Sequence, residues 1–292
     1  MTFKENRLAE LCEIVSSKRV FAASYQSEGV PFFRGKEVSQ LARGENTTAE
    51  LYISDEVYND VILRTGPINS GDILLTAVGT LGNPYQVKGT DLPFYFKDGN
   101  IVWLRKFSEE INSSYLFYWL NSEYGRRKVL ETAIGSTQAA LTITGLSSIS
   151  ISCPSLAQQN GIVRILSAID QKISINNALS KNLEEIAQTI FKSWFIDFEP
   201  VKAKMAGERP AGMDATTAAL FSDSMEESEV GFIPKGWEIR KIESLCETLL
   251  GGTPSRARNE FWGGEIPWIN SGKVNEFRIT AASESITELG LE

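Results

Sequence analysis

The sequence lacks the side chains on which most enzyme active sites depend. It contains no histidine, which excludes Ser-His-Asp triads, histidine general bases and histidine metal ligands. Its three cysteines, Cys12, Cys153 and Cys246, are far apart and form no CxxC pair, which is typical of reduced thiols rather than of a metal site or disulfide framework. The GxxxxGK[ST] pattern of a phosphate-binding loop is also absent. We therefore expect no catalytic site, metal or cofactor in this chain.

Consecutive cations in a predicted helix are suited to nucleic acid instead. Arg126, Arg127 and Lys128 lie near the end of the helical run Ser113–Glu131. Contacts from such side chains to phosphates give an affinity that is independent of base sequence and falls with salt. The alternative is a solvated helix end, where cations interact favourably with the helix dipole.

Two further cations, Arg34 and Lys36, lie on the strand-like run Val30–Val38. From a strand they could reach a DNA groove, where arginine bound to guanine is the commonest specific base contact. The alternative is an ordinary exposed strand face.

Two loops offer polar groups to the same surface. The first, Ala77–Tyr85, has glycines where the backbone must turn, and we interpret it as a structural turn near DNA with Thr80 among the contacts. The second, Gly135–Thr142, is small and polar and suits a loop in a groove, although a plain connector is the alternative. Its donors and acceptors, of which glutamine can read adenine, are Ser136, Thr137 and Gln138.

Composition limits these interpretations. The net charge of −8 excludes a strongly basic nucleic-acid binder but not a local basic face. A length of 292 residues suggests two domains, and the hydrophobic content of 42% suffices for a core. There is no apolar run long enough to span a membrane and no secretory signal at the start, so we expect a cytoplasmic protein.

The elements that carry these residues alternate between strands and turns over the first half of the chain. Val30–Val38 and Gly99–Phe107 are predicted strands, and Ser70–Gly82 contains a buried strand. Ser113–Glu131 is a predicted helix, and Ile149–Pro154 alternates as an edge strand does. This pattern predicts a mixed α/β domain.

A long helix follows. From Ala157 to Asp197 no proline interrupts the sequence, Ser155 is a candidate N-cap, and Pro200 lies past the end. Inward positions alternate in steps of four and three, the spacing of a coiled-coil seam, and the helix would be roughly 60 Å long. The seam, with polar residues at two positions, is Ile162, Leu166, Ile169, Ile173, Asn176, Ser180, Leu183, Ala187, Ile190 and Trp194. Such a seam needs a second helix, whereas the alternative is a core helix packed on its own domain.

Residues 199–230 are acidic, show no hydrophobic period and are predicted to form a linker. After them, segments of the first domain recur in the same order. Leu8–Glu13 recurs as Ile242–Glu247, and Val30–Val38 recurs as Ile266–Val274. Tyr52–Glu56 also recurs, as residues 285–289, at nearly the same offset, which indicates an internal repeat. Because the second copy is shorter than the first, we expect a truncated protein.

The second copy carries the sharpest motif, GGTPSRARNEFWGGEIPWINSGKV (Gly251–Val274). It resembles the opening of a target recognition domain in the DNA-specificity (S) subunits of type I restriction-modification systems. Pro234–Leu245, the run GDILLTAVGTLG, Ala140–Ile173 and Leu183–Val201 are similar to that family as well. The resemblance covers most of the chain.

This resemblance implies a non-catalytic subunit in which two recognition domains alternate with two long helices that pair antiparallel as a spacer. Each domain would read one half of a bipartite site in double-stranded DNA. Methyltransferase (M) subunits would bind the subunit, and restriction (R) subunits would join them. The cofactor S-adenosylmethionine would be bound by the methyltransferase and not by this chain.

The chain departs from the family pattern in three ways. The second domain is incomplete, the second spacer helix is absent, and Ser16–Gly29 stands where the second copy has the GGTPS form. The remaining helix should therefore pair with that of a second copy, and we expect a two-fold homodimer with antiparallel helices.

The predicted fold class is α+β. We expect a recognition domain at 1–154, a coiled-coil spacer helix at 155–198, a linker at 199–230 and the first part of a second recognition domain at 231–292. The alternative function is a coiled-coil adaptor that binds only proteins. A nucleotide-dependent enzyme is disfavoured because histidines and phosphate loops are absent.

Overall fold

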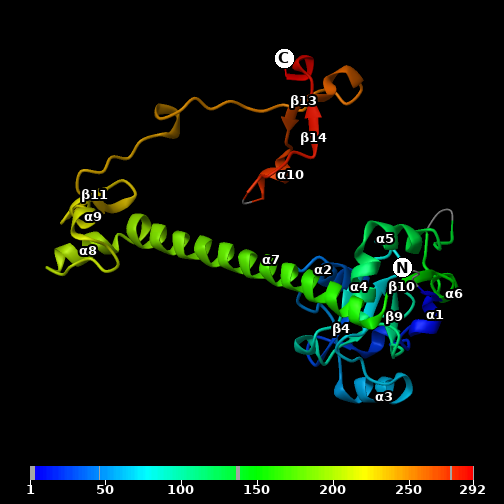
Figure 1. The fold of residues 1–292 in the computed structure, drawn as a ribbon. Helices are drawn as coiled ribbons and strands as arrows, with labels where there is room; N and C mark the ends of the chain where they lie inside the picture. The colour runs from blue at the N-terminus through cyan, green and yellow to red at the C-terminus, as the bar shows by residue number, and fades with distance from the viewer. Residues whose placement is uncertain (1–3, 46, 136–138, 277, 292) are drawn as a thin grey trace. The chain divides into compact units, whose positions relative to one another are not determined.

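The structure is a computed structural model that describes residues 4–45, 47–135, 139–276 and 278–291. The chain divides into two compact units, Met1–Leu183 and Glu184–Glu292, and each is considered by itself. The described residues form both helices and mainly antiparallel sheets, so the predicted α+β class is confirmed (Figure 1).

A four-stranded sheet with buried central strands organises the first unit. Its order is β2–β9–β6–β7, and all neighbouring strands are antiparallel. Every residue of the central strands is buried, and in one of them Ile73 and Leu75 enter one core while Leu74 enters another. Side chains alternate along a strand, so a strand that is buried on both faces has a continuous apolar sequence. The predicted buried strand within Ser70–Gly82 and the predicted strand within Gly99–Phe107 are both confirmed. The strands are β2 (Glu13–Val15), β9 (Ile101–Arg105), β6 (Ile73–Thr76) and β7 (Pro84–Gln86).

The first core joins one face of this sheet to four helices and a strand pair. β10 pairs antiparallel with β1, which confirms the predicted edge strand. Leu8 and Leu11 of the first helix are fully buried in this core. The elements are α1 (Leu8–Leu11), α4 (Ser113–Asn121), α5 (Glu123–Leu130), α6 (Ile143–Ser147), β1 (Lys4–Arg7) and β10 (Ser150–Cys153).

The second core lies between the other face and a second sheet of order β3–β5–β4–β8. Only the β4–β8 pair is parallel among the described pairs of this sheet. Trp103 is fully buried here, and its ring meets that of Phe96 edge-on. The elements are β3 (Tyr25–Gln26), β4 (Val30–Phe33), β5 (Tyr52–Ile53), β8 (Tyr95–Phe96), α2 (Gly35–Ala42), α3 (Asp55–Thr65), and the 3-10 turns η1 (Ala22–Ser24) and η2 (Gly89–Asp91).

The predicted helix Ser113–Glu131 is divided into α4 and α5 at Ser122. The Ser122 hydroxyl donates to the carbonyl of Trp119 at 2.6 Å and accepts the N–H of Gly125 at 3.0 Å, so it ends one helix and caps the next. A Cβ at Gly125 would lie 1.9 Å from the Trp119 carbonyl oxygen. The bend therefore depends on Ser122 and Gly125. The apolar periodicity continues across both residues, so it did not predict the bend.

The prediction of a strand over Val30–Val38 is wrong beyond Phe33. β4 ends there, and α2 begins at Gly35 with Arg34 as its N-cap. The carboxylate of Glu37 accepts the backbone N–H of Arg34 at 2.8 Å, which stabilises the first turn of the helix. Arg34 and Lys36 thus belong to a helix start and not to a strand.

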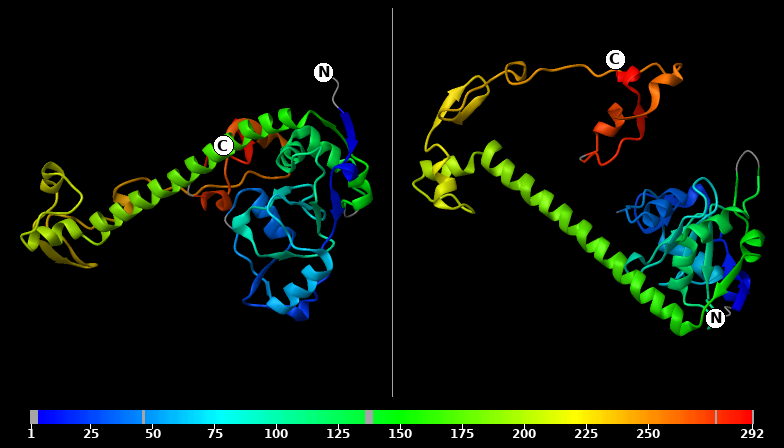
Figure 2. Two further views of the ribbon diagram at one scale, coloured as in Figure 1. Left: turned by 60° about the horizontal axis from the view of Figure 1, so that its bottom comes forward. Right: turned by 45° about the horizontal axis from the view of Figure 1, so that its top comes forward.

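The long helix is α7 (Leu156–Phe191), followed by a π-helical turn, η3 (Lys192–Ile196). Ser155 caps it as predicted, because its hydroxyl accepts the N–H of Gln158 at 3.4 Å while the Gln158 side chain accepts the N–H of Ser155 at 3.1 Å. In two further views, α7 extends away from the strands and helices of the first unit (Figure 2).

In the second unit, residues 199–230, which are predicted to form a linker, contain two short helices and the first strand of a hairpin. The ring of Phe221 lies 5.7 Å from that of Trp194 and 5.9 Å from that of Phe195. The ammonium of Lys204 donates to the carbonyls of Ala218 and Phe221. The elements here are α8 (Glu199–Met205), α9 (Ala215–Ala219) and the hairpin of β11 (Met225–Ser228) and β12 (Gly231–Pro234).

The internal repeat recurs in the pairing of strands. Val30 and Pro31 pair antiparallel with Ile53 and Tyr52, and their counterparts Ile266 and Pro267 pair with Ile286 and Ser285 in the same register. A helix follows each strand in both copies. The second copy contains η4 (Ile242–Ser244), η5 (Asn259–Phe261), β13 (Trp262–Trp268), α10 (Ser271–Val274), β14 (Glu284–Ile286) and α11 (Glu288–Leu291).

The two copies allow a matched test of the first core. Leu11 is fully buried, whereas Leu245, at the same repeat position, is 65% exposed. Leu11→Ala should lower the free energy of unfolding by about 2–5 kcal/mol because it leaves a cavity. Leu245→Ala should change it by less than about 0.5 kcal/mol. Urea unfolding monitored by circular dichroism measures both, and equal effects would contradict this account of the core.

Candidate nucleic-acid interface and helix face

The predicted cations of α5 lie in three different environments. Arg126 donates from its guanidinium to the side-chain oxygen of Asn83 at 2.9 Å. Arg127 lies over the ring of Tyr124, 5.6 Å from its centroid, and Lys128 pairs with Glu131 at 2.9 Å. Among the described residues Arg126 and Arg127 form no ion pair, although Glu131, which is paired with Lys128, lies near Arg127.

The turn that carries Thr80 packs directly against α5. Gly82 lies against Val129, since a Cβ added to this glycine would be 3.2 Å from a Val129 methyl group. Thr80 is exposed in the turn, and its contact with DNA stays a prediction. The contact between Asn83 and Arg126 joins the same two elements, so the turn and the helix form one surface.

The flanks of the predicted groove loop meet this turn. Ala140 bridges to both Val78 and Ile134, and the N–H of Leu141 donates to the carbonyl of Ala77 at 2.9 Å. Ser136, Thr137 and Gln138 lie outside the described residues. The described residues on either side of them, Ile134 and Ala140, pair with one another, and Ala140 also pairs with Val78 of the Thr80 turn.

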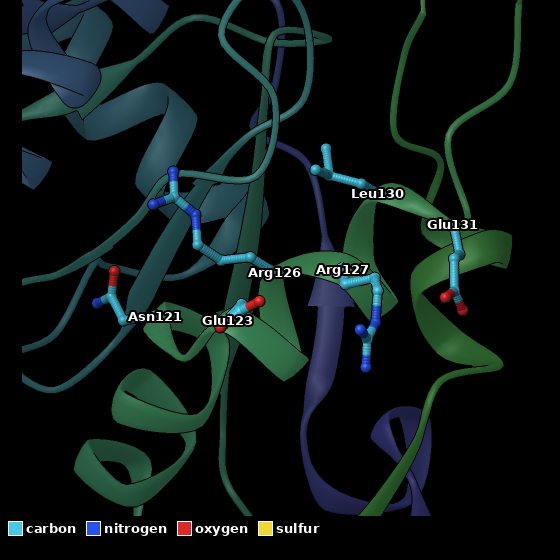
Figure 3. A pocket seen from close by; sticks show the side chains of 6 residues that line it. All are labelled: Asn121, Glu123, Arg126, Arg127, Leu130 and Glu131. Carbon is cyan, nitrogen blue, oxygen red and sulfur yellow. The ribbon is translucent and has the colours of Figure 1, made fainter.

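A cavity of about 710 Å³ opens along α5. Arg126 and Arg127 project from the helix in different directions, and both line this cavity (Figure 3). Its other lining residues are Asn121, Glu123, Leu130 and Glu131. The cavity therefore presents two cations beside carboxylates, one of which is already paired with Lys128.

Arg34 and Lys36, unlike Arg126 and Arg127, form ion pairs with carboxylates. Arg34 pairs with Glu37 and Glu50, and Lys36 pairs with Glu50. Burial alone would raise the pKa of Glu37, but the hydrogen bonds from Arg34 outweigh it and lower this pKa below its usual value. Hydrogen bonds from Lys36 and Arg34 likewise lower the pKa of Glu50. Carboxylates that stay ionised neutralise both cations, which weakens the prediction that they bind DNA.

Gln159, which the sequence analysis did not single out, fixes the root of α7 in the first unit. Its side chain is fully buried and accepts the N–H of Asn112 at 2.8 Å. Its amide donates to the carbonyls of Glu110 and Pro154, each at 2.9 Å. Glutamine in an amphipathic helix gives no signal that distinguishes such an anchor from a solvated residue.

A second polar contact lies farther along α7. The hydroxyl of Tyr118 on α4 donates to the carboxylate of Asp170 at 2.7 Å. Burial raises the pKa of Tyr118, and the hydrogen bond to Asp170 raises it further, so the hydroxyl stays protonated at neutral pH. Together with Gln159, this contact sets the direction in which the helix leaves the first unit.

Beyond these contacts, the predicted seam of α7 is exposed. Ile169 and Ile173 are 51% and 52% exposed, and Asn176, Ala187 and Ile190 are exposed too. Within the described residues the helix is therefore not a core helix packed on its own domain. Three further exposed apolar side chains, Ile165, Leu179 and Ile186, follow the seam on one flank at intervals of seven or fourteen residues. The apolar face is thus wider than a two-stranded seam requires.

At its far end the helix is capped by an aromatic cluster within the second unit. Phe195 stacks on Trp237 with centroids 6.4 Å apart, and Phe198 meets the same ring edge-on at 5.5 Å. Trp194, the last predicted seam residue, contacts Phe221 instead of a second helix. The seam available for pairing therefore ends before Trp194.

The part of the chain that the structure describes was also searched for metal ligands and membrane-spanning helices. No cluster of cysteine and acidic side chains there could hold a metal ion. Burial raises the pKa of Cys12 to about 12, so this thiol stays protonated. None of the described helices is both long and apolar enough to cross a membrane.

Residues 1–185 match the family described as the type I restriction modification DNA specificity domain. Because this match covers more than half of the chain, the chain belongs to that family.

Among curated proteins the chain is similar to the type I restriction enzyme HindI specificity subunit of Haemophilus influenzae, with 27% identity over 76% of this chain and 58% of that protein. It is also similar to the MjaIX specificity subunit of Methanocaldococcus jannaschii, with 24% identity over 92% and 56%. The crystal structure of the HsdS subunit from Thermoanaerobacter tengcongensis aligns with a TM-score of 0.42 and 20% identity, over 66% of this chain and 44% of that one. The chain spans somewhat more than half the length of these curated relatives.

Proposed function

We propose that this chain is the DNA-recognition subunit of a type I restriction-modification complex and has no catalytic activity of its own. The observation that carries the proposal is the surface formed by the Thr80 turn, α5 and the flanks of the 135–139 loop. It presents two arginines that form no ion pair with any described residue, on a unit whose sequence matches the DNA specificity family. Phosphate contacts from these arginines would position the unit on the duplex, and the loop would read base edges.

The net charge of the chain is compatible with this role. Its value of −8 describes the whole sequence, whereas DNA at close range responds to the local field of the surface it meets. Arg126 and Arg127 lie on that surface, and much of the acidic surplus of the chain lies in residues 199–230 of the second unit. Binding should accordingly be local, oriented and dependent on salt.

The exposed face of α7 supports a second part of the proposal, a two-fold homodimer with antiparallel helices. A face of this width is covered either by another copy or by a partner of the same helical, apolar kind. The 36 residues of α7 correspond to roughly 54 Å of helix, which would set the distance between two recognition domains. Each domain would read one half of a split DNA site.

The flank of the face, with Ile165, Leu179 and Ile186, leaves apolar area beside a two-helix seam. We propose that methyltransferase subunits dock on the helices, bring S-adenosylmethionine with them and are joined by restriction subunits. The complex would act in the cytoplasm. The same exposed face also favours the alternative, a coiled-coil adaptor that binds only proteins, and DNA binding distinguishes the two.

The first prediction of this proposal concerns DNA. The chain should bind a mixed-sequence duplex with an affinity that falls steeply with salt. Arg126→Gln combined with Arg127→Gln should reduce the slope of log affinity against log salt by about 1.8 per bound domain, because each phosphate contact contributes about 0.9. Lys36→Gln, which removes a cation already neutralised by Glu50, is the matched control and should leave the slope unchanged.

Fluorescence anisotropy across a salt series measures these slopes. An unmodified chain without measurable affinity for duplex DNA at low salt would contradict the proposal and favour the adaptor.

The second prediction concerns the helix face. Light scattering at tens of micromolar should show a dimer. Ile169→Gln combined with Ile173→Gln should raise its dissociation constant at least about a thousandfold, since each buried isoleucine contributes about 1.5–3 kcal/mol and four are lost per dimer. Ile175→Gln changes an isoleucine that is 63% exposed outside the seam and should have little effect. A monomeric unmodified chain would exclude the homodimer.

A further inference from the structure

The turn between β6 and β7 is held in one conformation by a buried threonine. The hydroxyl of Thr76 donates to the carbonyl of Thr80 and accepts the N–H of Asn83 at 3.0 Å. The backbone of Thr76 also accepts the N–H of Gly82 at 2.8 Å and donates to the carbonyl of Asn83 at 3.2 Å. Gly79 and Gly82 have positive φ angles of 81° and 71°, which side chains would disfavour. The exposed tip is therefore set by the strand beneath it.

Asn83 connects this turn to α5. Its side chain is buried, and its oxygen accepts a hydrogen bond from the Arg126 guanidinium at 2.9 Å. A guanidinium has five N–H donors in a fixed planar arrangement, so one bond to Asn83 orients the group and leaves other donors available. Gly82 and Val129 pack beside this bond and hold the two elements together.

Arg126 differs from two other arginines of the first unit in the charge of the group that accepts its hydrogen bond. Arg34 is oriented by Glu37 and Glu50, and Arg105 by Glu13, so each is neutralised by the group that holds it. Asn83 orients Arg126 without neutralising it. An oriented cation that keeps its charge is suited to a phosphate, because the ordering entropy is already spent and no ion pair must be broken.

We propose that Asn83 is a positioning residue that presents Arg126 to a DNA phosphate beside Thr80. The inference rests on the proposed DNA-recognition function and assigns different roles to two residues, since Asn83 would orient Arg126 and Arg126 would contact the phosphate. The neutral side-chain amide of Asn83 in the turn orients the guanidinium of Arg126 on the helix, so the position of the phosphate contact depends on the conformation of the turn. Asn83 itself is buried and touches no phosphate.

Asn83→Asp tests this directly in the full chain. Aspartate keeps the acceptor for Arg126 and the backbone contacts with Thr76, but it adds the charge that neutralises the guanidinium. With a mixed-sequence duplex of about 30 base pairs, roughly three helical turns, the slope of log affinity against log salt should fall by about 0.9 per bound domain. Arg126→Gln should cause the same reduction, and the double variant should cause no more than either change alone.

Asn59→Asp is the matched control for added charge. Asn59 is exposed on α3, which lies at the opposite end of the first unit from α5 (Figure 1). This variant should keep the slope of the unmodified chain. Asn83→Ala, which removes the acceptor and adds no charge, should keep the slope but weaken binding, because Arg126 then has to be ordered by the phosphate.

Each outcome bears on the inference. An unchanged slope in Asn83→Asp alongside a reduced slope in Arg126→Gln would overturn it and leave the proposed function standing. An unchanged slope in Arg126→Gln would also overturn it, even if Asn83→Asp failed to fold. Unmodified affinity in Asn83→Ala would do so as well. An unmodified chain that does not bind the duplex at all would overturn the proposed function and this inference together.

Discussion

The apolar face of α7 is the constraint on which the rest of this structure depends. A helix of 36 residues is anchored at its root by buried Gln159 and at its other end by the ring cluster around Phe195 and Trp237. Between these anchors its isoleucines and leucines remain exposed. Exposed apolar area of this extent is unfavourable in water, and it is the basis for the proposal that a second helix covers α7.

The proposed recognition surface depends on which cations of the domain are paired with carboxylates. Arg34 and Lys36 stabilise the start of α2 through Glu37 and Glu50, so their charge is used within the fold. Arg126 is held by the neutral side chain of Asn83 and forms no ion pair among the described residues. An acidic protein can bind a polyanion in this way, because affinity depends on the few cations that no carboxylate compensates and not on the overall balance.

Periodicity predicted the parts of the fold that depend on burial alone. The buried strand β6, the strand β9, the edge strand β10 and the exposed seam follow from the apolar pattern, and the Ser155 cap follows from the residue type at the helix start. Single polar contacts decided the rest. Ser122 divides a helix, Glu37 starts one directly after a strand, Phe221 folds the expected linker, and Asn83 aims Arg126. Each depends on a partner distant in space or on one cap, which a pattern of hydrophobicity does not report.

A methylation map tests the central claim most directly. The chain would be co-expressed with its cognate methyltransferase subunit, and the modified adenines of the host genome would be identified. The account predicts one split motif with palindromic halves, since two identical chains paired through α7 would place the same recognition surface at each end. Absence of any motif, with both proteins folded and associated, would contradict DNA recognition by this chain, and a split motif with unrelated halves would contradict the pairing of identical copies.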